Sequence, residues 1–453
     1  MATASHSPAI EVTAPPGEQQ IFAPVRGKAR IDVLDILRGL AILSIFYMNL
    51  PDMAGPTWAS MQDPRTLGWA PADQQAYVFL RTVMVGTQRG LLEMLFGAGM
   101  LVMFRKAMDA NGPVRVADIY VRRNLWLLFF GLVDIYLLLW YGDIIHGYAL
   151  CGLALYPFRN LKPRALLIIG LLFASVNFVG GSVQYVGRIS DASEVARIEA
   201  RQAAHKSLTA DDKKTLTEWN ERKAKVGKLE PDMKKRAVEE AKARAGSLWD
   251  YMQWNWGVYS TLIGEGLLLF TVIEATSTMF VGMALFKLGI MQGERSTRFY
   301  VAMLVACYGF GLTARYVGVH ERLAFDLAPK TAWALEEYAR LAVTAGHIAA
   351  INLAVRAASG RAILAPFKAA GQLALTIYFL QQITGMYLMY SPAGLHLPSA
   401  PGWAHILLYA TIVNALLIVF ANVWVRTIGM GPMEWLLRSL SYWKRQPWKA
   451  GSA

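Results

Sequence analysis

The chain has 453 residues, of which 55% are hydrophobic and only 17% are charged. Soluble domains carry about a quarter charged residues, so this composition excludes an ordinary soluble protein and indicates a membrane protein. The formal net charge of +13 is compatible with nucleic acid as a partner. The basic residues, however, collect in short loops between apolar runs, which is typical of orientation signals and lipid headgroup contact. We therefore expect membrane lipids, and not nucleic acid, as partners.

The apolar runs predict the fold class, which is an all-α polytopic membrane helix bundle. A run of about 20 apolar residues is long enough to cross the hydrocarbon core of a bilayer. We expect about ten such helices, at 33–51, 77–104, 124–141, 144–158, 165–184, 272–290, 299–317, 338–357, 368–390 and 403–424. The apolar segment 256–271 is expected to be a half-helix or an interfacial segment before the sixth crossing.

The loops and the two ends of the chain predict its orientation. Residues 1–30 are polar and are interpreted as a disordered tail without a cleavable signal peptide. Because basic residues fill alternate short loops, the positive-inside rule places both termini in the cytoplasm. The chain then divides into a first transmembrane half (31–186), a second half of five helices (256–430) and a cytoplasmic C-terminal segment (431–453).

A charged insertion separates the two halves. Residues 187–255 are rich in Ala, Lys, Glu and Arg of both charge signs, which predicts one or two solvated helices on the outer side. Long loops translocate regardless of their charge, so these lysines do not contradict the orientation. The insertion is either a solvated helical hairpin without chemistry or a lid or partner-docking surface.

Ionisable residues in the first apolar run are candidate substrate-binding residues. Asp35 and Arg38 are three residues apart, so both side chains lie on one helical face. Asn49 follows Arg38 by eleven residues and falls on the same stripe. The stripe is either a structural ion pair or the lining of a cavity that binds a charged group, because intramembrane charges often mark functional sites.

The turn before the fourth predicted crossing contains candidate catalytic residues. Asp143 and His146 are three residues apart, so the carboxylate can orient the imidazole as in a general base. The alternative is a satisfied polar pair at the membrane–water boundary.

Two further helices carry polar positions at helical spacing. Arg89 and Glu93 are spaced for an ion pair within one helix and are candidate binding residues. Glu336, Arg340, Thr344 and His347 form a polar seam along the eighth predicted crossing. Arg340 is a candidate binding residue, and His347 is either a catalytic base or proton carrier or a hydrogen-bonded core residue.

Other chemistry has little support in the sequence. Glu265 and Glu274 are half a turn out of phase, so they share one site only if the helix breaks between them. The seven histidines are scattered and show no metal-binding spacing, so we expect no metal ion. Walker and dinucleotide-binding motifs are also missing from the sequence, and no cofactor is predicted with certainty.

Four runs in this order resemble the YeiB-like family of bacterial inner-membrane proteins, a domain of unknown function numbered 418. They are Leu34-Asp-Ile-Leu-Arg-Gly39, Leu95-Phe-Gly-Ala-Gly99, Trp140-Tyr-Gly-Asp-Ile144 with Tyr148, and Gly371-Gln-Leu-Ala-Leu-Thr-Ile-Tyr378 leading to Gly431-Pro-Met-Glu-Trp435. The resemblance implies a multi-pass protein of the inner membrane, and some members are labelled transporters.

The first run is also similar to that of transmembrane acyltransferases of the heparan-glucosaminide acetyltransferase type. The resemblance implies transfer of acyl groups from cytosolic acyl-CoA to acceptors beyond the membrane. Those enzymes use a His soon after the first helix, but residues 50–73 contain none here. His146 or His347 would have to substitute, and Asp35 and Arg38 would shape the entry for an acyl-CoA phosphate.

Two function classes follow. The leading hypothesis is a transmembrane acyltransferase, with acyl-CoA as donor, an envelope glycan or lipid as acceptor and Asp143 and His146 as the base machinery. The alternative is a secondary transporter of a small molecule with a proton relay through Asp35, Glu93 or His347. A receptor or scaffold and a homodimer are left open.

Overall fold

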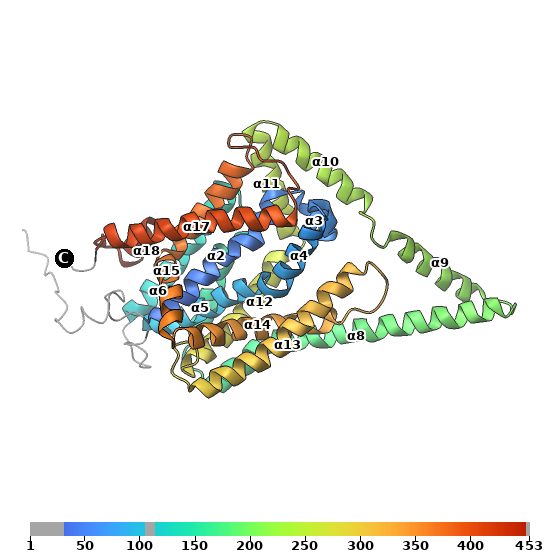
Figure 1. The fold of residues 1–453 in the computed structure, drawn as a ribbon, viewed down its shortest axis with the longest axis horizontal. Coiled ribbons are helices and arrows are strands. Elements are labelled where there is room, and N and C mark those ends of the chain that lie inside the picture. The colour runs from blue at the N-terminus through green and yellow to red at the C-terminus, as the bar shows by residue number, and fades with distance from the viewer. Residues whose placement is uncertain (1–30, 105–113, 450–453) are drawn as a thin grey trace, which may run out of the picture.

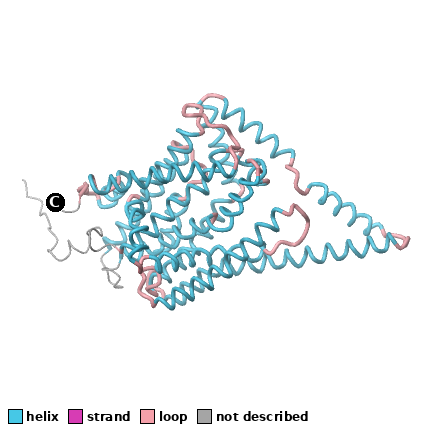
Figure 2. Tube along the Cα trace, viewed as in Figure 1, coloured by secondary structure: helices cyan, strands magenta, loops and turns pink. Residues whose placement is uncertain are grey.

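The computed structural model describes residues 31–104 and 114–449, and the predicted N-terminal tail lies outside them. These residues form helices and loops without a strand (Figure 2). In chain order the α-helices are α2 (Asp32–Ala54), α3 (Thr57–Gln62), α4 (Pro71–Phe79), α5 (Thr87–Phe104), α6 (Val114–Tyr136), α7 (Ile145–Leu155), α8 (Pro163–Ala203), α9 (Ala210–Lys225), α10 (Pro231–Ala245), α11 (Leu248–Gly264), α12 (Leu267–Lys287), α13 (Thr297–Leu323), α14 (Ala332–Ala354), α15 (Ala358–Gln372), α16 (Ala374–Gln382), α17 (Trp403–Thr427) and α18 (Pro432–Tyr442). The all-α fold class is confirmed.

Several of these helices are long and apolar enough to cross a bilayer. Among the described residues they are α2, α8, α12, α13 and α17, and α14 with α15 adds a sixth if this pair, bent by 119°, is one span. The chain is therefore a multi-pass integral membrane protein in contact with lipid. The larger number of ten crossings stays a prediction.

Some of the remaining predicted crossings are interrupted or short, whereas the third falls on the continuous helix α6. The second is divided into α4, a π-helical turn at Leu80–Met84 and α5, with Gly86 at a φ of 80° between them. The fourth is α7, which has 11 residues and would span only about 16 Å. The α11–α12 junction is a break at Gly266, whose φ of 78° suits glycine.

Basic loops gather at one end of the bundle, which we call the basic end. Lys287 at the end of α12 donates to the carbonyls of Arg159 and Leu161, in the loop before α8. Lys368 of α15 pairs with Asp32 at 2.7 Å and brings the start of α2 to the same end. These loops are the ones that the positive-inside rule places in the cytoplasm.

The charged insertion is an arm that leaves the bundle (Figure 1). α8 continues as one helix of 41 residues past the predicted boundary at 187, because its sequence changes from apolar to charged without a helix breaker. α9 and α10 then return to the bundle, and together with the outer part of α8 they outline a triangle. The end of the bundle to which α10 returns is called the far end below.

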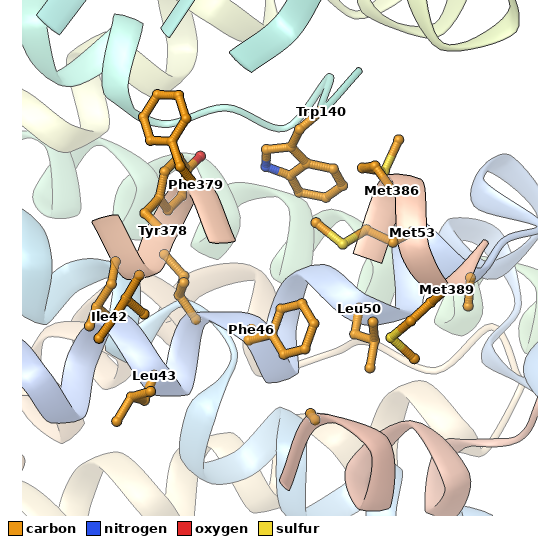
Figure 3. Close-up of a cluster of buried hydrophobic side chains, with 14 of the residues drawn as sticks. Ile42, Leu43, Phe46, Leu50, Met53, Trp140, Tyr378, Phe379, Met386 and Met389 are labelled. Carbon is orange, nitrogen blue, oxygen red and sulfur yellow. The ribbon is translucent and has the colours of Figure 1, made fainter. Parts of the chain in front are cut away.

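The apolar core lies between α2 and the segment formed by α16 and the π-helical turn after it. Figure 3 shows Phe46 and Met53 of α2 facing the side chains of Tyr378 and Met386, with Trp140 beside them. These five side chains are almost completely buried. The loop that carries Trp140 is thereby held against α2, and this contact positions the polar residues that follow it.

Candidate functional site

A cavity of about 410 Å³ enters the bundle from the basic end. Its walls come from α2, α5, α6, α7, α15, α16 and α18, and its outer rim includes Ile31 and Met103. The inner wall is made by Ile144, Tyr148 and Tyr378. Leu, Ile, Met and Phe make up nearly half of the lining residues, so the cavity suits a molecule with an apolar part.

Three arginines, Arg38, Arg123 and Arg438, line this cavity. Arg38 pairs with Asp35 at 2.8 Å, as predicted from their spacing. Arg123 lies over the ring of Phe96 at 5.3 Å and has no acidic partner within the described residues. Asn49, the third residue of the predicted stripe, does not contribute to the cavity wall. Arg123 therefore offers a guanidinium group to an anion in this cavity.

Asp143 and His146 lie directly behind the inner wall. Asp143 Oδ2 accepts hydrogen bonds from the backbone N–H of His146 and from its Nδ1, each at 2.8 Å. The hydroxyl of Tyr378, a cavity residue, donates to Asp143 Oδ1 at 3.0 Å and accepts from the Ile144 N–H at 3.3 Å. Tyr378 thus connects the cavity with the predicted catalytic pair.

One ring nitrogen of His146 has a hydrogen-bond partner, and the other has none among the described residues. Because Nδ1 faces Asp143, the neutral ring carries its proton there and leaves Nε2 as the acceptor. The imidazole is buried, and Nε2 has no hydrogen-bond partner in the described part of the chain. A buried ring nitrogen without a partner is expected where a ligand completes the site.

Asp134 of α6 joins this group, although the sequence reading missed it. Its carboxyl is completely buried and lies against Asp143 and Tyr378. Neither of its oxygens makes a hydrogen bond of good geometry with a described residue. Its position inside an apolar helix is the same signal that singled out Asp35 and could have found it. We call Asp134, Asp143, His146 and Tyr378 the His146 cluster.

Glu434 lies far from Tyr378 in the sequence but helps to position it in the fold. This side chain of α18 accepts hydrogen bonds from the backbone N–H of Leu375 at 2.7 Å and of Thr376 at 3.1 Å, and from the Thr376 hydroxyl at 2.6 Å. These N–H groups belong to the first turn of α16 and have no partner within that helix. Glu434 therefore caps the helix that carries Tyr378.

A second buried polar group joins α5, α12 and α14. Arg340 lies 3.3 Å from Glu93, 3.2 Å from Glu274 and 2.6 Å from Glu337. Arg89 lies 3.2 Å from Glu93, as predicted, and 2.5 Å from Glu274. All three carboxylates therefore have arginine partners. We call these five residues the Arg340 cluster.

The Arg340 cluster reaches the cavity through Tyr148, whose hydroxyl is 3.4 Å from Glu93 Oε1.

His347, predicted as a second candidate base, has its own partners: its Nδ1 lies 2.7 Å from the Tyr308 hydroxyl and its Nε2 lies 3.3 Å from the Val83 carbonyl. The second acid considered with Glu274, Glu265, is exposed at the break before α12. The described residues contain no group of three His, Cys, Asp or Glu side chains that could hold a metal ion.

Comparisons with known proteins show which proteins the chain is similar to. Residues 285–444 match the family described as "Protein of unknown function (DUF418)". The chain is 28% identical to the uncharacterized protein YxaH of Bacillus subtilis, over 94% of this chain and 97% of that protein. It is 26% identical to the uncharacterized protein YeiB of Escherichia coli, over 90% of this chain and 95% of that protein. The resemblance to the YeiB-like DUF418 family is confirmed. No solved structure matches this chain.

Only some of the site residues lie in the range that matches DUF418. It includes α14, with Arg340, and the α16–α18 pair, with Tyr378 and Glu434. Asp143 and His146 lie before it in the chain and meet Tyr378 across a sequence separation of more than 200 residues. The cavity is therefore built from both halves of this YeiB-like sequence.

Proposed function

We propose that this protein transfers an acyl group from cytosolic acyl-CoA to an acceptor hydroxyl or amine of the cell envelope, as a multi-pass protein of the bacterial inner membrane. The observation that carries the proposal is the Asp143–His146 pair with its unpartnered Nε2, directly behind the inner wall of a cavity that opens at the basic end. A buried carboxylate–imidazole pair is the usual device for activating a hydroxyl or amine.

In this mechanism His146 Nε2 takes the proton of the acceptor as its oxygen or nitrogen attacks the thioester carbonyl carbon. The carbon–sulfur bond then breaks, and the proton passes from His146 to the leaving thiolate. Asp143 holds the imidazole in the required tautomer through the 2.8 Å contact to Nδ1. The reaction has no net proton release, so one base is sufficient.

The cavity supports the donor end of the proposal. Guanidinium groups recognise phosphates by charge-assisted hydrogen bonds, and Arg38 and Arg123 both line the wall. Arg123 is the better candidate for the donor phosphates, since Arg38 already has a carboxylate partner. The apolar interior suits the pantetheine arm and the acyl chain that lead from the phosphates toward Tyr378.

The test is acyl transfer by the purified full-length protein in lipid vesicles. Acetyl-CoA labelled in the acetyl group is supplied at the cavity side together with envelope glycan and lipid fractions. We expect release of CoA and entry of label into one fraction, with a loss of at least about 100-fold in His146→Ala. His347→Ala is the matched control, because this half-buried imidazole has other partners, and it should keep most of the activity.

Equal activity in the two histidine variants would contradict the proposal. The Arg340 cluster motivates a second candidate function, because its buried carboxylate Glu93 contacts the cavity residue Tyr148 and shares arginine partners with the buried Glu274. A secondary transporter with a proton relay would show proton flux coupled to uptake, without CoA release. Loss of that flux in Glu93→Gln and its survival in His146→Ala would favour the transporter.

A further inference from the structure

A seam of polar contacts joins α10 of the arm to α3 and the loop after it. At the exposed end of the seam Arg65 donates to the carbonyl of Gly227 at 2.6 Å. The Glu230 N–H donates to Gln62 at 3.1 Å, and the Arg236 guanidinium lies over the Trp58 ring at 4.7 Å. These contacts are surface pairs of the kind that contribute little stability individually.

The seam ends in a buried ion pair. Glu240 is 1% exposed and Arg244 is 4% exposed, and their side chains are 2.8 Å apart. Glu240 accepts a hydrogen bond from the backbone N–H of Thr57 at 2.7 Å, and Arg244 donates to the Met53 carbonyl at 2.9 Å. Gly55 lies directly beneath the pair, where a Cβ would come within 2.3 Å of Glu240. The chain approaches closely there because Gly55 has no side chain.

This pair lies over a chain of contacts that leads from the far end to the His146 cluster. Beneath it, the Thr57 hydroxyl contacts the Tyr141 hydroxyl at 3.0 Å, and Tyr141 lies two residues before Asp143. On the other side, the ring of Tyr259 in α11 is 6.1 Å from the ring of His146. The cavity lies on the other side of Tyr378 and opens at the basic end, whereas α10 covers the far end in the described conformation.

We propose that α10 is a hinged lid, anchored by the Glu240–Arg244 pair, that opens the far end to a molecule arriving from outside the membrane. Polar interfaces between packed units favour relative motion, whereas large apolar ones do not. Hinge points flank the helix: Gly227, with a φ of 66°, lies before it and Gly246 lies directly after it. Within the proposed function the admitted molecule is the acyl acceptor.

The test of the lid uses no acyl donor, so its outcome does not depend on whether the protein transfers acyl groups. Thr57 is completely buried under α10, and Cys307 is replaced by Ser in all variants to remove a half-buried thiol. A Thr57→Cys probe is then treated with a membrane-impermeant maleimide from the far side. We expect slow labelling, and labelling at least about 10-fold faster after Glu240→Ala, since loss of one partner leaves Arg244 buried and unpaired.

Two controls separate lid opening from general unfolding. Glu239→Ala removes the exposed neighbour of Glu240 and should leave the labelling rate unchanged. The native Cys151, which is completely buried in the bundle, should stay unlabelled in every variant. Unchanged Thr57→Cys labelling in Glu240→Ala, with an intact bundle, would overturn the lid.

Hydrogen exchange of the unaltered chain keeps the proposal testable if the variants fail to fold. Peptides from α3 and α10 should exchange together and faster than the core of α2, because the Thr57 N–H is protected only by Glu240. If α3 and α10 exchange as slowly as the core of α2, the lid proposal is wrong.

Discussion

The two buried polar clusters differ in how far their charges are compensated. In the Arg340 cluster three carboxylates meet two arginines, and each carboxylate has a partner within 3.3 Å. In the His146 cluster two buried carboxyl groups lie side by side without a cation, and the oxygens of Asp134 and the Nε2 of His146 lack partners among the described residues.

This difference separates a group that stabilises the fold from one that awaits a ligand. A compensated network in a low-dielectric interior holds helices together, and it becomes costly only when one member is removed. An uncompensated group costs stability in the resting protein and is kept where function requires it. Substitutions in the two clusters should therefore act on different properties, and three measurements test this.

The largest effect is expected from Arg340→Met. Removal of this guanidinium leaves three carboxylates around a buried apolar side chain, so stability should fall by about 3–5 kcal/mol. The measurement is the free energy of unfolding in detergent, with exposed Arg361→Met as a control expected to change it by less than about 0.5 kcal/mol. If Arg340→Met is as stable as the parent chain, the Arg340 cluster is not a structural lock.

Asp134→Leu should raise the free energy of unfolding, in contrast to Arg340→Met. Since the Asp134 carboxyl is buried without a hydrogen bond of good geometry, an apolar side chain of similar size should raise stability by about 1–3 kcal/mol. Acyl transfer should be lost in the same variant. A variant that is destabilised yet active would show that Asp134 belongs with the structural residues.

Tyr378→Phe tests the connection between cavity and base. The substitution removes the hydroxyl that donates to Asp143, and loss of one hydrogen bond to a carboxylate predicts a roughly 10-fold slower transfer. Tyr308→Phe removes the corresponding hydroxyl beside His347 and should leave the rate unchanged. Equal effects of both variants would break the distinction between the two histidines.

The smallest effect is expected at Asp212, an acid of the arm. Hydrogen bonds from the backbone and hydroxyl of Thr209, together with Arg201, lower the pKa of Asp212 below its ordinary value. Since the folded pKa is below the unfolded one, the stabilisation is complete above the unfolded pKa and is lost as the pH falls through the folded pKa. Hydrogen exchange at the start of α9 should therefore speed up only in acid, without a change in the bundle.

Periodicity and charge spacing predicted much of this molecule. The apolar runs predicted the all-α class. Residues three or four positions apart predicted three contacts, which are the Asp35–Arg38 pair, the Arg89–Glu93 pair and the contact between Asp143 and His146. Such pairs are local, so helix geometry alone determines them. The sequence allowed Glu265 and Glu274 to share a site only if the helix broke between them. The helix does break at Gly266, but Glu265 is exposed there while Glu274 lies in the Arg340 cluster.

The partners that complete the site are distant in sequence and could not be read from spacing. Tyr378 reaches Asp143, and Arg340 reaches Glu93, only because the helices pack in a particular order. Hydrophobicity gives no such order, since lipid-facing and core-facing runs look alike. The positive φ of Gly86 and the π-helical turn before it similarly divide a run that appeared as one crossing.

The length of α8 has a practical consequence. At 1.5 Å per residue its 41 residues extend about 60 Å, roughly twice the thickness of the hydrocarbon layer. The turn after Ala203 is therefore carried well clear of the bilayer surface on a single rigid rod. An epitope tag or a protease site inserted in this turn would report, in intact cells, which side of the membrane it occupies, without disturbing any residue of the cavity.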